Sequence, residues 1–416
     1  MGHMLATYLQ RLVDPLLDEL LAEFPAVLLV GPRATGKTTT ALRHAKTIVQ
    51  LDDPAQAAAF RADPGAALRE LEEPVLVDEW QVVPEVLGAI KRTVDRAPGP
   101  GRFLITGSVR AVLDGQSWPL TGRAIRVQMS GLVEREIQGN STSTTPLDLV
   151  ATGRLEDLRV PKEPPDLRDY VELALRSGFP DAVLRERERS RRRWLDGYVE
   201  ELLTRDVEEQ APGRDPARLR RYLEVLALNT AGTPDRTKLS TAAGVAPDTA
   251  VAYHRLLTNL LVVDTIPAWS SRRIKRHARA AKRFVVDPGV VGAVLGLDVS
   301  GVMRDGDLLG RVIETLVAAQ LRAEVPLSDQ RPRLHHLRTE KGRQEIDVLI
   351  EYGGGRIVAI EVKAGSAPTM RDARHLIWLR DQIGDRFVAG LVLHTGPGMF
   401  ELAERVAAVP ICALWG

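Results

Sequence analysis

The 416-residue sequence has a single cysteine and few lysines, and each scarcity excludes something. Cys412 has no second cysteine to pair with, so an intrachain disulfide and a cysteine-based zinc site are both excluded. Lysine accounts for nine of the 56 basic residues, and arginine supplies the rest. Because 55 acidic residues leave a net charge of +1, the chain is not a polybasic protein that coats nucleic acid, although local basic patches remain possible.

Long apolar runs are also missing. No stretch reaches the roughly 18 apolar residues that a membrane-spanning helix needs. Acidic residues at 14, 18 and 19 interrupt the start of the chain before the apolar core of a signal peptide develops. We therefore expect a cytoplasmic protein that does not enter a membrane. The hydrophobic content of 44% is ordinary for a globular chain, and the length predicts two or three domains.

Short apolar runs alternate with helical patterns in the first third of the chain. We expect strands at 26–30, 47–52, 74–80 and 101–108, and helices at 5–23, 38–46 and 83–96. The Asp-Pro pairs that begin at Asp53 and Asp63 each predict the start of a short helix. Buried strands that alternate with helices predict a parallel α/β sheet.

The first strand leads into a segment that fits G-x-x-x-x-G-K-[ST]. In this pattern the glycines let backbone N–H groups turn toward phosphates, Lys37 brings a positive charge to them, and the Thr38 hydroxyl binds Mg²⁺. The strand before the segment and the helix after it are the context that the motif requires. The candidate ATP-binding residues are Gly31, Pro32, Arg33, Ala34, Thr35, Gly36, Lys37, Thr38 and Thr39.

Two later strands end in polar residues that suit the same site. Asp78 and Glu79 follow a buried run, where carboxylates are unfavourable unless something uses them. Beside a phosphate loop, Asp78 is expected to anchor Mg²⁺ and Glu79 to polarise the attacking water. The strand at 101–108 ends in small hydroxyl residues, of which Ser108 is the candidate sensor of the γ-phosphate and Thr106 the alternative.

Four segments, GPRATGKTT, VDEWQ, LITGS and LTGR, together resemble the prokaryotic AAA-type ATPases that carry a C-terminal DUF4143 region. SGFPDAV (177–183), YVEELLTRDV (198–207) and FVVDPGVVGAVLG (284–296) resemble that C-terminal region, which we place at about 168–364. The phosphate loop departs from the usual G-P-R-Q-V-G-K-T of the family at Ala34 and Thr35, and the phosphate-binding residues are intact.

The family resemblance also implies a homo-oligomeric ring. In AAA-type rings an arginine from a neighbouring subunit reaches the γ-phosphate. Arg123, in LTGR, is the candidate for this arginine finger, and Arg110 is the alternative.

Residues 236–266 have the spacing of a helix-turn-helix and resemble winged-helix modules. A short helix is expected to end at Gly244, and Asp248 or Thr249 opens a longer one. In DNA-binding modules the second helix reads bases, and here it offers Asp248, Tyr253, His254 and Arg255. The basic charge lies instead in the segment 271–283, which could grip the phosphates of DNA or RNA. The alternatives are a solvated wing and an ATPase lid that packs on its neighbour.

Two alternating runs at 345–352 and 356–364, joined by three glycines, predict a β-hairpin. Pairing Tyr352 with Arg356 places Asp347 opposite Glu361. Like charges directly opposite each other are destabilising. A divalent cation or a nearby lysine would remove that penalty.

The pattern D-x₁₃-E-x-K in this hairpin resembles the PD-(D/E)XK nuclease superfamily, although Ile346 stands where the pattern has proline. The resemblance implies that Asp347 and Glu361 bind Mg²⁺, with Glu314 from a helix at 308–324 as a further metal ligand. It also implies that Glu361 and Lys363 take part in catalysis, the lysine by activating water or stabilising phosphate. The alternative is an inactive nuclease fold held by a salt bridge of Lys363.

These patterns predict three parts. We expect an AAA-type P-loop ATPase domain over 1–160, a helical and winged-helix region over 161–300, and a PD-(D/E)XK nuclease-like α/β domain over 301–416. The predicted function is Mg²⁺-dependent ATP hydrolysis coupled to nucleic-acid binding or processing. The alternative, from another class, is an ATP-driven regulatory switch or protein-binding scaffold with an inactive nuclease fold.

Overall fold

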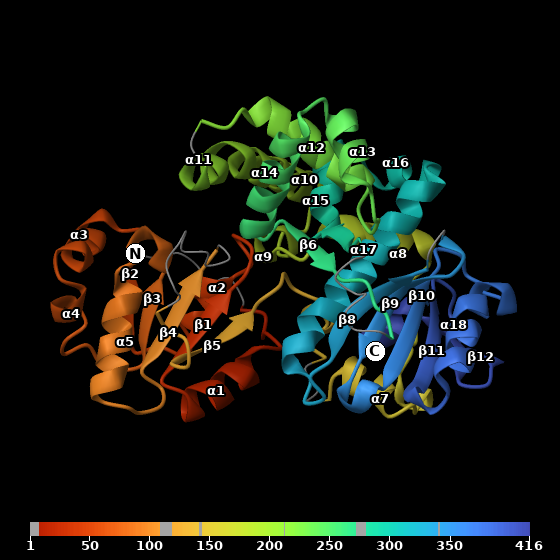
Figure 1. Ribbon diagram of the computed structural model, residues 1–416, viewed down its shortest axis with the longest axis horizontal. Helices are drawn as coiled ribbons and strands as arrows, with labels where there is room; N and C mark the ends of the chain where they lie inside the picture. Colours follow the sequence, from red (N-terminus) through yellow and green to blue (C-terminus); the bar gives the residue numbers. More distant parts are fainter. Residues whose placement is uncertain (1–7, 109–118, 141–143, 212, 272–279, 340–341) are drawn as a thin grey trace. The chain divides into compact units, whose positions relative to one another are not determined.

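The computed structural model describes residues 8–108, 119–140, 144–211, 213–271, 280–339 and 342–416 (Figure 1). The chain forms two compact units. The first comprises Met1–Leu132 together with Thr258–Leu261, and the second comprises Val133–Leu257 together with Val262–Gly416. In the described part of the chain, every helix is too short or too polar to cross a membrane.

The first unit is built on a five-stranded sheet with the order β2-β3-β4-β1-β5. Its strands are β1 (Ala26–Val30), β2 (Thr47–Gln50), β3 (Val75–Asp78), β4 (Phe103–Gly107) and β5 (Ala124–Gln128). Every pairing is parallel, which confirms the predicted parallel α/β sheet. Because the strands run the same way, β1, β3 and β4 end at one edge of the sheet, where such sheets bind ligands.

Five helices accompany this sheet: α1 (Asp14–Glu23), α2 (Lys37–Ala41), α3 (Pro54–Ala62), α4 (Pro64–Ala67) and α5 (Val86–Arg96). Helix α5 lies against the sheet (Figure 1), and its apolar side chains share one buried cluster with those of the strands. Helices α3 and α4 begin at the two Asp-Pro pairs as predicted. Asp53 accepts a hydrogen bond from the Ala55 amide and Asp63 from the Ala66 amide, each at 2.9 Å, so each aspartate satisfies a donor in the first helical turn.

Two predicted helix boundaries were wrong. The helix expected at 5–23 begins at Asp14 in the described residues. Pro15 fits the first turn, but further inside a helix it would remove a backbone hydrogen bond and clash with the preceding turn. The helix expected at 38–46 ends at Ala41, because its β-branched threonines are weak helix formers.

The second unit begins with a helical part that confirms the helical pattern predicted for 168–232. Between α10 and α11 lies a π-helical segment, Leu202–Asp206. The helices of this unit are α6 (Glu134–Ile137), α7 (Pro146–Ala151), α8 (Leu167–Arg176), α9 (Pro180–Val183), α10 (Glu188–Glu201), α11 (Val207–Gln210), α12 (Pro216–Leu228), α13 (Arg236–Ala243), α14 (Pro247–Asn259), α15 (Pro288–Leu295), α16 (Val299–Arg304), α17 (Gly306–Glu324) and α18 (Met370–Ile383).

A buried carboxylate fixes the start of α15 in this helical part. Asp287 accepts backbone hydrogen bonds from Gly289 at 2.8 Å and from Val290 at 3.2 Å, which caps the helix. It also accepts one from Gly178 at 2.8 Å, from the distant loop before α9. The approach is close, because a Cβ on Gly289 would lie 2.5 Å from the Ser177 Cβ. Asp287 therefore joins two segments that are far apart in the sequence.

A six-stranded sheet with the order β12-β13-β11-β10-β9-β8 completes the second unit. Its strands are β8 (Arg333–Arg338), β9 (Glu345–Glu351), β10 (Ile357–Val362), β11 (Phe387–His394), β12 (Phe400–Ala403) and β13 (Val406–Pro410). Strands β8, β9 and β10 form an antiparallel meander, and β10, β11 and β13 run parallel. Helix α18 connects β10 to β11 and packs against the sheet (Figure 1).

The hairpin of β9 and β10 has the predicted register. The Tyr352 amide donates to the Arg356 carbonyl at 2.9 Å, and Ile350 lies opposite Val358. The same register continued along the strands places Asp347 opposite Glu361. The alternation of residue types and the glycine loop were sufficient to define this pairing.

Candidate functional site

Two glycines shape the loop that follows β1. Gly36 has φ +87°, a left-handed conformation that favours glycine. At Gly31 the obstacle is space, because a Cβ there would lie 2.1 Å from the carbonyl oxygen of Met129. The backbone path of the loop therefore depends on glycine at both positions.

Lys37 opens α2 with its side chain buried against this loop. Its Nζ donates to the Pro32 carbonyl oxygen at 2.8 Å, and the Thr35 hydroxyl donates to the same oxygen at 2.8 Å. Burial lowers the pKa of Lys37 to about 8, although the carboxylates of Glu79 and Asp78 oppose the shift. A bound polyphosphate would give this ammonium a stronger anionic partner.

Arg11, which sequence reasoning missed, holds the loop from the segment before α1. Its buried guanidinium donates through Nη1 to the Thr35 carbonyl at 2.9 Å. Through Nη2 it donates to the Ser130 carbonyl at 2.8 Å. Nothing in its neighbouring sequence distinguishes Arg11 from the many other arginines, so only the fold reveals this role.

The two Mg²⁺ ligands predicted for the phosphate-loop site lie side by side. The Thr38 hydroxyl donates to Asp78, with Oγ1 2.8 Å from Oδ1. Asp78 is buried at the end of β3, and the Thr106 hydroxyl from β4 donates to the same carboxylate oxygen. The structure thus brings three oxygen-bearing side chains together at the carboxyl edge of the sheet.

Glu79 and Ser108 also meet at this edge, with Gln81 between them. The Gln81 amide donates to Glu79 Oε2, and the Ser108 hydroxyl lies 3.4 Å from that oxygen. Burial raises the pKa of Glu79, and the Lys37 ammonium partly opposes this. Glu79 has φ +53°, so the chain turns sharply just after the strand.

The other predicted ATP-binding residues differ in their exposure. Arg33 and Ala34 are half-buried, and Ala34 is left-handed with φ +63°. Thr39 is exposed on α2.

Arg123 lies at the opposite edge of the sheet from the phosphate loop. It immediately precedes β5, whose first residue pairs with the first residue of β1, whereas the loop follows the last residue of β1. Arg123 pairs with Asp95 at 2.9 Å, and both side chains are 38% exposed. It therefore does not serve the phosphate loop of its own unit. Arg110, the alternative, lies outside the described residues.

The helices and strands expected for the helix-turn-helix region are present. Helix α13 ends at Gly244, which is left-handed with φ +64°, and α14 follows. Strands β6 (Val263–Ile266) and β7 (Lys282–Val285) then pair in antiparallel fashion. The winged-helix class itself stays a prediction.

Two of the four candidate base-reading residues on α14 are withdrawn from the surface. Tyr253 is buried, and its ring centroid lies 6.0 Å from that of Tyr222. His254 is half-buried, and burial lowers its pKa to about 4. Asp248 and Arg255 remain exposed.

Most of the basic segment 271–283, at 272–279, lies outside the described residues. Of the rest, Lys282 is buried and Arg283 donates to the Pro234 carbonyl at 3.0 Å.

The C-terminal carboxylates converge around Lys282, which the sequence analysis did not place there. Its Nζ lies 2.5 Å from Glu314 Oε1 and 3.0 Å from Asp347 Oδ1. Glu361 lies beside them and accepts a hydrogen bond from Lys363 at 2.7 Å. The structure thus brings together the four residues that the nuclease resemblance selected, but with an additional ammonium among them.

The charges of this cluster shift the pKa values of its members. Burial raises the pKa of Glu314 and of Glu361 to about 8 each, and the negative charge of Asp347 adds to both shifts. For Asp347 burial also acts to raise the pKa, but the Lys282 ammonium, the Val362 amide and the Lys363 ammonium together outweigh it and hold the pKa below its usual value. Among the described residues, no three His, Cys, Asp or Glu side chains are grouped so as to hold a metal ion.

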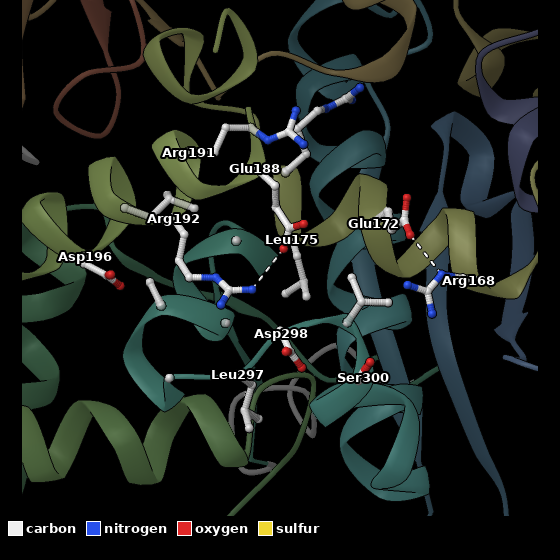
Figure 2. Close-up of a pocket in the computed structure, with 17 residues that line it drawn as sticks. Arg168, Glu172, Leu175, Glu188, Arg191, Arg192, Asp196, Leu297, Asp298 and Ser300 are labelled. Carbon is white, nitrogen blue, oxygen red and sulfur yellow. Dashed lines mark hydrogen bonds and ion pairs between the residues drawn. The ribbon is translucent and has the colours of Figure 1, made fainter. Parts of the chain in front are cut away.

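A separate cavity of about 460 Å³ lies between α8, α10, α15 and α16 in the second unit. Figure 2 shows two ion pairs among its charged side chains. Arg192 donates to Glu188 at 2.9 Å, and Arg168 donates to Glu172 at 3.0 Å. Because its charges are balanced in this way, the cavity indicates no particular class of ligand.

Comparison with known families agrees with the geometry of the first unit. Residues 23–138 match the AAA domain family, residues 167–300 a domain of unknown function, DUF8612, and residues 309–414 another, DUF4143. The first unit is therefore an AAA-type P-loop domain, a fold that implies nucleotide binding.

The chain also has relatives that match over most of its length. It is 30% identical to the uncharacterized protein Rv2008c of Mycobacterium tuberculosis over 392 residues, which are 93% of this chain and 80% of that protein. The uncharacterized protein Mb2031c of Mycobacterium bovis matches with the same values. The chain belongs to the family of these mycobacterial proteins.

Among solved structures, the Walker-type ATPase PABY2304 of Pyrococcus abyssi is 16% identical, with a TM-score of 0.41. The match covers 68% of this chain and 94% of that one. A likeness of this size bears on neither mechanism nor substrate.

Proposed function

We propose that the first unit hydrolyses ATP with the help of Mg²⁺. The observation that carries this proposal is the contact of Thr38 with Asp78 at the carboxyl edge of the sheet, next to the loop that Lys37 closes. Glu79 follows Asp78 directly, so a candidate catalytic acid lies beside the candidate metal ligands.

The residues present fit a nucleotide with Mg²⁺. A buried carboxylate and a threonine hydroxyl are oxygen donors of the kind that Mg²⁺ prefers. When bound, the ion would neutralise charge on the phosphates. Lys37 would bind the phosphate oxygens through its ammonium.

Glu79 would orient the attacking water and accept its proton. Its raised pKa suits a general base, because a base works best when its pKa approaches the operating pH. The Gln81 amide and the Ser108 hydroxyl both contact Oε2 of Glu79, and these contacts orient the carboxylate for the reaction.

The direct test is Lys37→Ala in the full chain. ATP binding, followed with a fluorescent ATP analogue, and phosphate release should both be lost, because the loop would have lost its cation. Lys91→Ala is the matched control, since Lys91 is an exposed lysine of the same unit paired with Asp95. Phosphate release from Lys37→Ala at the rate of the control would refute the proposal.

We further propose that ATP turnover is coupled to nucleic acid bound by the basic segment 271–283. In support, the segment connects two paired strands directly after helices spaced as a helix-turn-helix. Binding to DNA or RNA should weaken with salt, with a log–log slope of about 0.9 for each duplex phosphate neutralised. Replacing Arg272, Arg273, Lys275 and Arg276 with serine should lower that slope by several units.

The second candidate is an ATP-driven switch that acts on a protein partner. It is favoured by the outer side of α14, where Val251 is 47% exposed between Asp248 and Arg255 and Tyr253 is buried. An apolar residue flanked by opposite charges suits a protein surface better than a phosphate backbone. ATP turnover that is insensitive to single-stranded and double-stranded DNA, with no DNA binding at low salt, would favour this candidate.

A further inference from the structure

Lys282 places an ammonium among the carboxylates of the second unit. The residue opens β7 and is 1% exposed. Its Nζ lies 2.5 Å from Glu314 on α17 and 3.0 Å from Asp347 on β9. Three elements that are far apart in the sequence thus meet at one buried positive charge.

An ammonium is unfavourable in such a place unless it is paired, because burial removes its hydration. Here two carboxylates compensate for that loss. They gain in return, since Glu314 and Asp347 would otherwise repel each other at close range in a medium of low dielectric constant. The positive charge of Lys282 therefore offsets the repulsion between neighbouring carboxylates.

The hydrogen bonds leave little room for a second cation. Lys282 occupies one oxygen of Glu314 and one of Asp347. The other oxygen of Asp347 accepts the Val362 amide hydrogen at 2.9 Å. Lys363 occupies Glu361 Oε1 at 2.7 Å. A divalent ion at this position would also be repelled by both ammonium groups.

One carboxylate oxygen of the cluster is not satisfied by a hydrogen bond. Glu361 is buried, and its Oε2 makes no hydrogen bond to any described residue. A buried acceptor without a partner is unusual, and a carboxylate oxygen that is not engaged is available as a metal ligand. Glu361 Oε2 is thus a potential metal ligand, and the positive charge of Lys282 keeps a metal ion away from it.

We propose that Lys282 is the resident cation of this site and takes the place of a divalent metal there. With Lys282 present, the described carboxylates are not grouped to hold a metal, and the wild-type site binds none. Removal of Lys282 alone frees Glu314, Asp347 and Glu361 to close around a metal ion. This inference concerns the second unit and is independent of ATP hydrolysis in the first.

The test uses the full chain without nucleotide, with Mn²⁺ as the probe. Bound Mn²⁺ is counted by electron paramagnetic resonance, and the melting temperature is measured with and without the ion. We compare the wild type with Lys282→Met, which removes the charge, and with Lys282→Arg, which keeps it. Asp347→Asn is introduced into the wild type and into Lys282→Met, so that Mn²⁺ bound at this cluster is distinguished from Mn²⁺ bound near Thr38.

Lys282→Met should bind one more Mn²⁺ than the wild type and should melt lower without the ion. Mn²⁺ should then raise its melting temperature by about 5 °C or more. The additional Mn²⁺ and the rise in melting temperature with Mn²⁺ should both be absent from the wild type, from Lys282→Arg and from the double variant Lys282→Met with Asp347→Asn. If Lys282→Met does not fold without Mn²⁺, refolding in its presence provides the same measurement.

Two results would overturn the inference. One is a wild-type protein that binds Mn²⁺ and loses that ion on Asp347→Asn, which would mean that Lys282 does not exclude the metal. The other is a Lys282→Met variant that gains no Mn²⁺ under either condition, which would mean that the carboxylates are not a latent metal site.

Discussion

Thr38 donates its hydroxyl hydrogen to Asp78 across 2.8 Å, which connects the first turn after the phosphate loop to the end of a strand 40 residues later. Because Thr106 donates to the same carboxylate, the ends of three strand–loop segments meet at Asp78. Thr38, Asp78 and Thr106 thus form one hydrogen-bonded group at the carboxyl edge of the sheet. The predictions for the first unit follow from it.

Glu79→Gln should retain ATP binding and lose turnover by roughly 10²- to 10⁴-fold, because an amide cannot accept the proton of the attacking water. Binding and phosphate release should be measured on the same preparation. Gln81→Ala is the control, since it removes the donor to Glu79 but keeps the carboxylate, and it should reduce turnover far less. Hydrolysis by Glu79→Gln at the wild-type rate would remove Glu79 from the mechanism.

ATP affinity should depend on pH through Lys37. In the free protein burial holds the pKa of this lysine at about 8. Below that pH the ammonium is already charged, whereas above it a proton must be taken up for phosphate to bind. The dissociation constant should therefore rise by about tenfold per pH unit above pH 8. Lys37→Arg stays charged and should give a nearly flat profile between pH 7 and 9.5; a flat wild-type profile would contradict the prediction.

Arg123→Ala should lower turnover only in an assembled oligomer, because Arg123 lies away from the phosphate loop of its own unit and can reach only that of a neighbour. Because its ion pair with Asp95 is exposed, its loss should change stability very little. Asp95→Asn removes the same ion pair and keeps the arginine, so it should leave turnover intact. An equal loss of turnover in a monomeric Arg123→Ala preparation would exclude the finger role.

Asp287→Ala should destabilise the second unit by about 3–5 kcal/mol, because it leaves three backbone donors, two of them buried, without an acceptor. Denaturant unfolding measures the change. Asp298→Ala is the matched control, since Asp298 caps the exposed start of α16, and its loss should destabilise the protein clearly less. Similar losses of stability for the two variants would show that the hydrogen bonds by which Asp287 joins Gly178 to α15 contribute little to stability.

The features that sequence predicted best are those decided by neighbouring residues. The Asp-Pro pairs define where α3 and α4 begin. The register of the 345–364 hairpin follows from alternation and a glycine loop. The contact of Thr38 with Asp78 follows from a motif and from the rule that parallel strands end at one edge.

The features that sequence missed depend on packing between distant segments. Lys282 contacts Asp347, which is 65 residues away in the sequence. From the sequence alone, Lys282 was one of several basic residues in a segment expected at the surface. Arg11 reaches Thr35 from outside any motif. Tyr253 was a candidate for reading bases but packs near Tyr222, because the pattern of the helix alone did not reveal which face the fold covers.

The position of Arg11 has a practical consequence for dissecting the protein. The AAA match begins at residue 23, which invites a fragment cut at that point. Such a fragment would keep every motif residue of the loop and lose the side chain that ties Thr35 to Ser130. Its failure to bind ATP would then say nothing about the motif, so an expression fragment of this domain should retain the residues from Tyr8 onward.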